Sequence, residues 1–337
     1  MLAILRFILA MFVVIAHLSE GVPFLSHWGI FAVFGFYLIS GYLITTILNE
    51  TYFFRFSAFL TNRFLRLFPI YYAVVLVSAF TIYVAPNANA FHPAWSPQFR
   101  LVDFGGNGLI FPFEFYDASF RVIPPAWSIA VELINYFLLW LLVARNRTMA
   151  ISALLITLIY HIISLSTGAD WGRRYFPFYA ALLPFAIGAC IYFFQSHLNL
   201  LSSEVIKRIS VFSFILWIIN LVFCGFVTVP GGSLFDVFFY TNLSFLTVFI
   251  YTTTHPTINT LKTRIGKILG DLAYPIFLTH WIVGFAMSQL VGERRGLTLL
   301  AASLIPILIV SFALSALANQ WFEPLRTRVR AQIKPRY

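Results

Sequence analysis

The sequence is poor in charged residues. Only 10% of its 337 residues are Asp, Glu, Lys or Arg, while 60% are hydrophobic, whereas soluble globular chains carry about 25% charged residues. This shortage of charge argues against a soluble domain with a hydrated surface. It predicts an all-α, polytopic transmembrane helical bundle.

Cysteine is nearly absent, and so are several common catalytic motifs. Cys190 and Cys224 fall in separate apolar stretches, so they build no disulfide framework and are interpreted as small buried hydrophobic residues. The sequence contains no GxGxxG, GxSxG, HExxH or CxxC pattern. A nucleotide-binding fold, a serine hydrolase and a zinc site therefore have no motif support, and we expect no metal and no permanently bound cofactor.

What the sequence has in abundance is apolar stretches, about ten of them. Each is long enough, or nearly so, to cross about 30 Å of hydrocarbon at about 20 residues per helix. We expect one transmembrane domain over residues 1–325, with a long connection at about 85–124 and a basic tail at 326–337. The predicted spans are Leu2–Leu18, Trp28–Leu48, Leu67–Val84, Pro125–Val143, Thr148–Ser166, Tyr175–Phe194, Ile209–Val229, Leu234–Thr254, Ile268–Val291 and Leu297–Phe322.

Lys and Arg residues gather at alternate ends of these spans. Six lie in one set of connections, namely Arg100, Arg121, Arg173, Arg174, Arg294 and Arg295. Fifteen lie in the opposite set and the tail, namely Arg55, Arg63, Arg66, Arg145, Arg147, Lys207, Arg208, Lys262, Arg264, Lys267, Arg326, Arg328, Arg330, Lys334 and Arg336. This asymmetry predicts that both termini are cytoplasmic and that the 85–124 connection faces outward. Charges at span ends do not favour nucleic-acid binding.

Two ionisable residues share one face of the first span. In "RFILAMFVVIAH", Arg6 and His17 are eleven residues apart, so they lie within about 20° of each other and about 16 Å apart along a helix. Arg6 would lie toward the cytoplasm and His17 toward the outside. Taken singly, Arg6 fits a snorkelling anchor and His17 fits an interfacial histidine.

The fourth span carries a carboxylate at a comparable depth. In "PPAWSIAVELINYF", Glu132 lies about 10 Å inside the outer surface. A buried carboxylate needs a partner. We expect Glu132 to orient His17, which leaves the second imidazole nitrogen free as a general base. The alternative is a structural polar clamp between helices.

Arginines and small residues follow near the inner surface. Arg63 and Arg66 in "TNRFLRLFPIYY" share a helix face and can grip phosphate, although the positive-inside rule explains them as well. Ser40 lies between Gly35 and Gly41 in "FGFYLISGYLITTIL". Small residues of this kind allow a neighbouring helix or a substrate chain to approach closely.

These elements together resemble the integral-membrane acyltransferases of acyltransferase family 3, which O-acylate carbohydrates and related molecules. The similarity comprises R-x10-H (Arg6, His17), "FYLISGYLI", "RFLRLFP", "WSIAVELINYF", "AYPIFLTHWIV" and "WFEPLR", in family order over nearly the full length. This sequence departs from the family at Leu133, where a second acidic residue is common, and at Thr279, which precedes His280. We therefore interpret His280 as structural or pocket-lining. We expect Asp271 and Glu323 to bind backbone or local arginines.

The resemblance implies an O-acyltransferase in a bacterial inner membrane that uses cytoplasmic acyl-CoA, acetyl-CoA in particular, as co-substrate. Arg63 and Arg66 would hold the donor phosphates, with Arg6 and Ser40 beside the thioester arm. His17 and Glu132 would serve catalysis at a carbohydrate or glycolipid acceptor. Trp127 and Ser128 of the same Trp-Ser signature would line the acceptor pocket.

Other functions also fit buried ionisable residues. A proton-coupled transporter would keep Arg, His and Glu in the bilayer, but inverted repeats and paired broken helices are not clear in the sequence. A non-catalytic subunit of an envelope-polymer assembly is a third interpretation. Within the enzyme interpretation, His17 could take either a proton or the acyl group.

Overall fold

The chain folds into a bundle of long apolar helices. The computed structural model describes residues 1–19, 22–85, 87–96, 98, 100–228, 231–258 and 264–333. Within these ranges nine helices are long and apolar enough to span a membrane, and a tenth apolar helix, α1, has 17 residues. The all-α prediction is confirmed, because the described residues form helices and only one isolated β-bridge, between Trp95 and Phe120.

The ten predicted stretches correspond to the ten apolar helices. These are α1 (Leu2–Leu18), α2 (His27–Ile47), α3 (Phe56–Val84), α6 (Ala126–Leu138), α7 (Arg147–Ser166), α9 (Phe178–Phe194), α10 (Ser203–Val227), α11 (Ser233–Thr253), α12 (Arg264–Val291) and α13 (Leu297–Ala331). Short turns of π-helix, η2 (Leu48–Tyr52) and η4 (Leu139–Val143), extend α2 and α6. The connections hold α4 (Ala88–Phe91), α5 (Leu101–Leu109), η3 (Phe111–Glu114) and α8 (Trp171–Tyr175).

Helices α3 and α13 extend furthest beyond the spans that hydropathy predicts. Helix α3 begins at Phe56 rather than at Leu67, and α13 runs through the predicted boundary of the basic tail to Ala331. The added segments carry polar residues that a hydropathy window excludes, yet their backbones continue the helix. Lys262, Lys334 and Arg336, which contribute to the charge asymmetry, lie outside the described residues.

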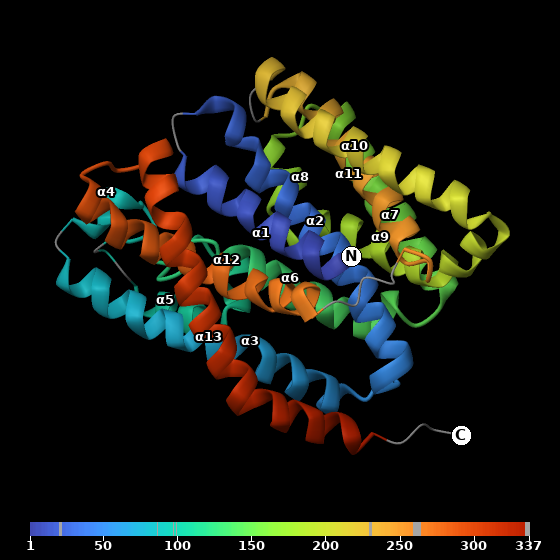
Figure 1. Ribbon diagram of the computed structural model, residues 1–337, viewed down its shortest axis with the longest axis horizontal. Helices are drawn as coiled ribbons and strands as arrows, with labels where there is room; N and C mark the ends of the chain where they lie inside the picture. Colours follow the sequence, from blue (N-terminus) through green and yellow to red (C-terminus); the bar gives the residue numbers. More distant parts are fainter. Residues whose placement is uncertain are drawn as a thin grey trace.

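Helix α1 runs through the middle of the molecule (Figure 1). It packs against α2 on one side and α12 on the other. The pairs α2–α9, α7–α9 and α10–α11 build one flank, and α12–α13 and α13–α3 build the opposite flank. Residues on α1 can therefore reach partners from both flanks.

The contact between α2 and α9 depends on two glycines. A Cβ atom at Gly41 would lie 2.3 Å from the carbonyl oxygen of Phe185, and one at Gly188 would lie 2.3 Å from that of Leu38. These positions allow the two backbones to touch, which explains Gly41 as helix packing.

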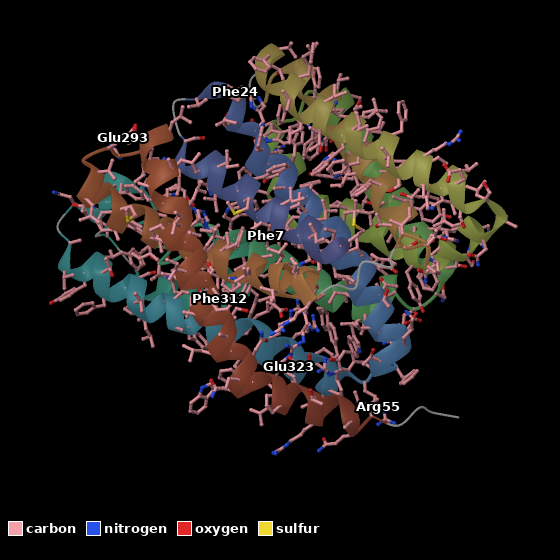
Figure 2. All side chains as sticks on the ribbon, viewed as in Figure 1. Phe7, Phe24, Arg55, Glu293, Phe312 and Glu323 are labelled. Carbon is pink, nitrogen blue, oxygen red and sulfur yellow. The ribbon has the colours of Figure 1, made fainter. Side chains whose placement is uncertain are left out.

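The bundle has two chemically different ends. Arg6 near the start of α1 and Arg326 near the end of α13 line one cavity, so the start of α1 and the last turns of α13 lie at this end, which we call the basic end. The other, called the loop end, holds α4, α5, η3 and the α12–α13 turn. Figure 2 shows Glu323 of the basic end and Glu293 of the loop end at opposite ends of α13.

Candidate active site

A cavity of about 390 Å³ opens among α1, α3, α12 and α13 at the basic end. Four cationic and two anionic side chains line it: Arg6, Arg66, Lys267, Arg326, Asp271 and Glu323. This excess of positive charge suits a polyanionic ligand such as a phosphate.

The two carboxylates of this cavity have local partners. Glu323 forms ion pairs with Arg326 (2.5 Å) and Arg330 (2.6 Å), which confirms the expectation for Glu323. Asp271 accepts a long hydrogen bond of 3.5 Å from Asn319. Neither carboxylate therefore offsets Arg66 by direct contact.

Arg63 and Arg66 lie on the same helix, but their surroundings differ. Both side chains are half-buried, but Arg66 lines the cavity and Arg63 does not. Among the described residues the Nε atom of Arg63 has no hydrogen-bond partner. A buried donor of this kind is costly unless a ligand or water meets it.

Glu132 lies in a polar cluster between the two flanks. The Ser40 hydroxyl donates a 2.6 Å hydrogen bond to Oε1 of Glu132, and the Tyr136 hydroxyl donates to the same atom. Arg6 lies within electrostatic range of Glu132. The structure thus brings Arg6, Ser40 and Glu132 together.

His17, near the end of α1, forms a pair with His280 of α12. The His17 Nδ1 atom lies 2.9 Å from Nε2 of His280, and the two rings stack with centroids 5.1 Å apart. His280 is fully buried, while His17 is partly accessible. Helix α12 presents His280 here because α1 and α12 pack along their length.

The neighbours of His280 determine where both protons lie. Its Nδ1 faces the carbonyl oxygens of Phe277 (2.8 Å) and Ile276 (3.3 Å), so Nδ1 must carry the hydrogen. A buried imidazole without a bonded carboxylate stays neutral, and its Nε2 is then an acceptor. His17 therefore donates from Nδ1, which leaves Nε2 of His17 with a free lone pair.

The expected hydrogen bond between His17 and Glu132 is not formed. Among the described residues His280 is the hydrogen-bond partner of His17, and Ser40 and Tyr136 are those of Glu132. The depth estimate was wrong because Pro125 is not at the surface. The chain before α6 is itself buried, with Val122 and Ile123 5% and 1% exposed.

Trp127 and Ser128 pack at the start of α6. The Trp127 ring contacts Tyr175 and Phe176, with centroids 5.6 and 4.9 Å away. The Ser128 hydroxyl donates to the carbonyl oxygen of Pro125 (2.9 Å). Neither residue lines the cavities described here, and their place in an acceptor pocket stays a prediction.

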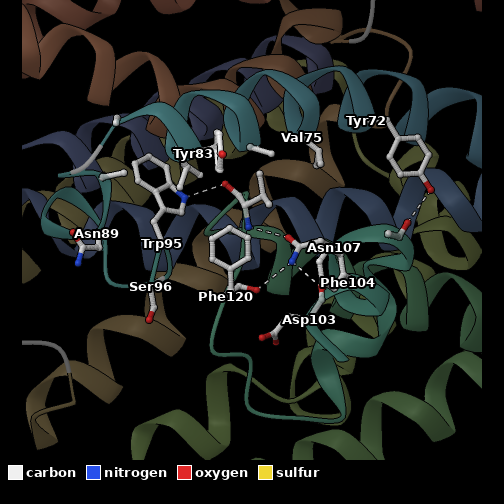
Figure 3. Close-up of a pocket in the computed structure, with 16 residues that line it drawn as sticks. Tyr72, Val75, Tyr83, Asn89, Trp95, Ser96, Asp103, Phe104, Asn107 and Phe120 are labelled. Carbon is white, nitrogen blue, oxygen red and sulfur yellow. Dashed lines mark hydrogen bonds between the residues drawn. The ribbon is translucent and has the colours of Figure 1, made fainter. Parts of the chain in front are cut away.

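A larger cavity of about 780 Å³ lies at the loop end, between α3, α4 and α5 (Figure 3). Asn107 fixes its floor by bonding to Phe120 and Val122, and the Trp95 indole donates to the carbonyl oxygen of Val122 (3.0 Å). Trp95 also contacts Phe285 on α12. Trp95 therefore forms a wall between this cavity and the helix that carries His280.

The sequence gives no sign that two further residues belong to these sites: Lys267 and Arg326 fit the topology signal, and both line the basic cavity. For His280, interpreted as structural or pocket-lining, the structure adds a hydrogen-bond partner, His17. The histidine in "AYPIFLTHWIV" was the available signal, but it does not reveal which helix α12 faces.

Comparison with known proteins identifies the family. Residues 2–318 match the family Acyl_transf_3, an acyltransferase domain. No curated protein and no solved structure matched the chain. Since the match covers nearly the whole chain, including α1, the His17–His280 pair and the walls of the basic cavity on α1, α3 and α12, the protein belongs to acyltransferase family 3 and is an integral, multi-pass membrane protein.

Proposed function

We propose that this protein is an O-acyltransferase that moves an acyl group, acetyl in particular, from acyl-CoA to a hydroxyl of a carbohydrate or glycolipid. In this proposal the protein lies in a bacterial inner membrane, with the basic end in the cytoplasm. The observation that carries the proposal is that one helix, α1, joins the two sites. Arg6 lines the cationic cavity, and His17 stands toward the other end, where its Nε2 has no hydrogen bond to the part of the chain that the structure describes.

Donor binding is assigned to the basic end. Arg66 and Arg63 would hold the phosphates of acyl-CoA, assisted by Lys267 and Arg326 in the cavity wall. Arg6 and Ser40 would lie along the thioester arm. Glu132 would serve by holding Ser40 and Tyr136 beside Arg6.

The chemical step is assigned to His17. Its Nε2 would take the proton of the acceptor hydroxyl while the oxygen attacks the thioester carbonyl. The C–S bond then breaks, and the imidazolium returns the proton to the leaving thiolate. Alternatively, Nε2 itself attacks the carbonyl and carries the acyl group, a route that an acyl adduct on His17 after acid quenching would identify.

Transfer from radiolabelled acetyl-CoA to candidate glycans tests the proposal. We expect His17→Ala in the purified full-length protein to lower transfer by about 10²- to 10⁴-fold, the usual contribution of a general base. His197→Ala, at an exposed histidine, serves as control and should transfer normally. Full transfer by His17→Ala would refute the mechanism, and transport without transfer would favour the transporter.

The same assay separates donor from acceptor binding. Arg63→Ala combined with Arg66→Ala should raise the apparent KM for acetyl-CoA more than that for the acceptor, because the lost groups would contact only the donor. Arg208→Ala, at an exposed arginine of α10, is the matched control for loss of positive charge. Equal effects on both KM values would contradict a phosphate-binding role.

A further inference from the structure

The cavity between α3, α4 and α5 has a length that the proposed function leaves unexplained. Its lining residues on α3 run from Tyr72 to Tyr83, which is eleven residues or about 16 Å along a helix axis. That length is about half of a 30 Å hydrocarbon layer, the depth of one leaflet. Figure 3 shows Tyr72 at one end of the cavity, and Asn89 and Ser96 at the other. The cavity thus has the length of one leaflet and runs from the middle of α3 to the loop end.

Helix α5 forms the second long wall of this cavity. The Tyr71 hydroxyl donates to the carbonyl oxygen of Asn107 (2.9 Å), and the Tyr72 hydroxyl donates to that of Gly108 (2.8 Å). These bonds hold the last turn of α5 beside the middle of α3. Gly108 lines the cavity, and a Cβ atom there would meet none of the described residues within 4 Å. Helix α5 therefore lies alongside α3, and space stays open between them.

The interior of the cavity is apolar. Helix α3 contributes Val75, Ala79 and Ile82 to the lining. The charged lining residue Asp103 is engaged in the cap of α5: its Oδ2 accepts from the backbone N–H of Arg100 (2.8 Å), and its Oδ1 lies 3.9 Å from the Arg100 guanidinium. The interior suits an apolar ligand body, whereas the hydroxyl groups of a sugar would lose hydrogen bonds there.

The cavity opens onto the lipid-facing surface. Tyr83 of α3 and Phe104 of α5 line it and are 89% and 62% exposed. Beside them on α3, Leu76 and Phe80 are also exposed. Exposed apolar side chains that gather on one surface mark contact with a membrane or a partner, and these belong to a span. The opening is therefore continuous with the hydrocarbon layer, and a lipid chain can enter it sideways.

A row of aromatic rings leads from the loop end of this cavity to His17. Trp95 lines the cavity, and its ring centroid lies 6.0 Å from that of His92. The His92 ring lies 4.2 Å from that of Trp281, which in turn lies 5.1 Å from that of His17. A ligand whose polar head lies at this end of the cavity would thus hold the head on the side where His17 lies.

Bilayer lipid would fill the apolar interior, but the row of rings joins this cavity to the residue assigned to the chemical step. We propose that the cavity binds the hydrocarbon anchor of a lipid-linked acceptor, with its sugar head beside Asn89 and Ser96. Both side chains can donate and accept hydrogen bonds with sugar hydroxyl groups. This inference rests on the proposed function, since it makes the acceptor a glycolipid in the leaflet at the loop end rather than a free carbohydrate.

Photolabelling tests the inference without any acyl donor. The full-length protein in phosphatidylcholine nanodiscs is irradiated with a glucosyl diacylglycerol that carries a diazirine in one acyl chain, and labelled peptides are located by mass spectrometry. Phosphatidylcholine with the same diazirine chain reports contact with bulk lipid. We expect the glycolipid to label the lining residues of α3 and α5 in a saturable way that unlabelled glucosyl diacylglycerol competes away. The phospholipid should show no such competition.

Variants on one helix assign the labelling to the cavity. Ala79→Phe places a large ring in the middle of the lining and should abolish the competed part of the labelling. Leu76→Phe is the matched control, because Leu76 lies outside the lining on the lipid-facing side of α3; it should label as the wild type does. The comparison of the two lipids on the wild-type protein is decisive even if a variant fails to fold.

Several results would overturn the inference: equal labelling by both lipids, no competition by unlabelled glycolipid, or full competed labelling in Ala79→Phe. The assay contains no acyl-CoA, so it separates this inference from the proposed function. Glycolipid-specific labelling without acetyl transfer would refute the proposed function and leave the binding site standing. Transfer to a water-soluble glycan without glycolipid labelling would retain the proposed function and overturn the lipid-anchor site.

Discussion

The pairing of His17 with His280 shows what single residues reveal before a structure is known. Arg6 and His17 were selected because their spacing places them on one face of a single helix, and α1 is indeed one helix over Leu2–Leu18. The partner of His17 was assigned to the wrong helix. Counting residues gives depth only when the start of a span lies at the surface, and it gives no angular order of helices; α12 rather than α6 faces this part of α1.

His280 is expected to act as a positioning residue. His280→Ala should lower kcat on the order of 100-fold, because His17 loses the acceptor that fixes its tautomer. The KM for acetyl-CoA should change little, since the proposed donor site lies at the basic end. Kinetics over a range of pH measure this, with partial recovery of kcat expected in His280→Gln, whose side-chain oxygen can accept the same hydrogen bond. An unchanged pH profile and kcat would show that the pair is not used.

Elements were predicted better than their ends. Apolar length identified every long helix, yet the start of α3 was placed at Leu67 because Phe56–Arg66 mixes polar and aromatic residues. The burial of the segment before α6 could not be predicted either, since hydropathy does not distinguish a loop folded into the protein from one at the membrane surface. This is why Glu132 lies with Ser40 and not with His17.

The crossing of α2 and α9 should tolerate no side chain at Gly41. In Gly41→Ala the new Cβ would meet the Phe185 backbone at 2.3 Å, so the helices must separate and lose contacts on both sides. We expect a destabilisation of about 1–3 kcal/mol, measured as a lower melting temperature in detergent. Gly105→Ala provides the matched control, because nothing lies within 4 Å of its Cβ position; equal melting of both variants would contradict the close packing.

Glu114 should make the junction between η3 and α9 sensitive to pH. Its carboxylate accepts a 2.7 Å hydrogen bond from the backbone N–H of Phe178, and burial raises the pKa of Glu114 from 4.5 to about 7. Between these values the folded protein holds the proton more tightly than the unfolded chain, so stability falls as pH rises from about 4.5 to about 7 and is then constant.

Melting temperatures at pH 5 and pH 8 measure this effect. Glu114→Gln keeps the acceptor oxygen but does not titrate, so its melting temperature should fall less than that of the wild type between the two values. Glu204→Gln, at an exposed carboxylate of α10, should follow the wild type. Parallel curves for Glu114→Gln and the wild type would disprove the assignment.

At the scale of the whole molecule, the charge asymmetry and the structure agree on one point. The first helix and the last helix meet at the basic end, where Arg6 and Arg326 line the same cavity. Which side of the membrane this end faces follows from the positive-inside rule alone. That the basic end faces the cytoplasm is therefore a separate prediction.

Cysteine labelling tests the orientation. In a protein with Cys190 and Cys224 replaced by Ala, a membrane-impermeant maleimide should label Asp117→Cys in intact cells, because the loop end is expected outside. Arg328→Cys, exposed at the basic end, should be labelled only in inverted vesicles. The reverse pattern would place the donor cavity on the wrong side for cytoplasmic acyl-CoA.

The hydrogen bond from His280 to a backbone carbonyl has a consequence for proton movement. A proton wire needs a group at each step that can both receive a proton and release another, and the carbonyl oxygens of Phe277 and Ile276 cannot do so. His280 therefore cannot pass on a proton that His17 takes up. That proton must leave His17 through the nitrogen by which it entered. The histidine pair can lend a proton within one reaction cycle, but it cannot conduct one across the membrane.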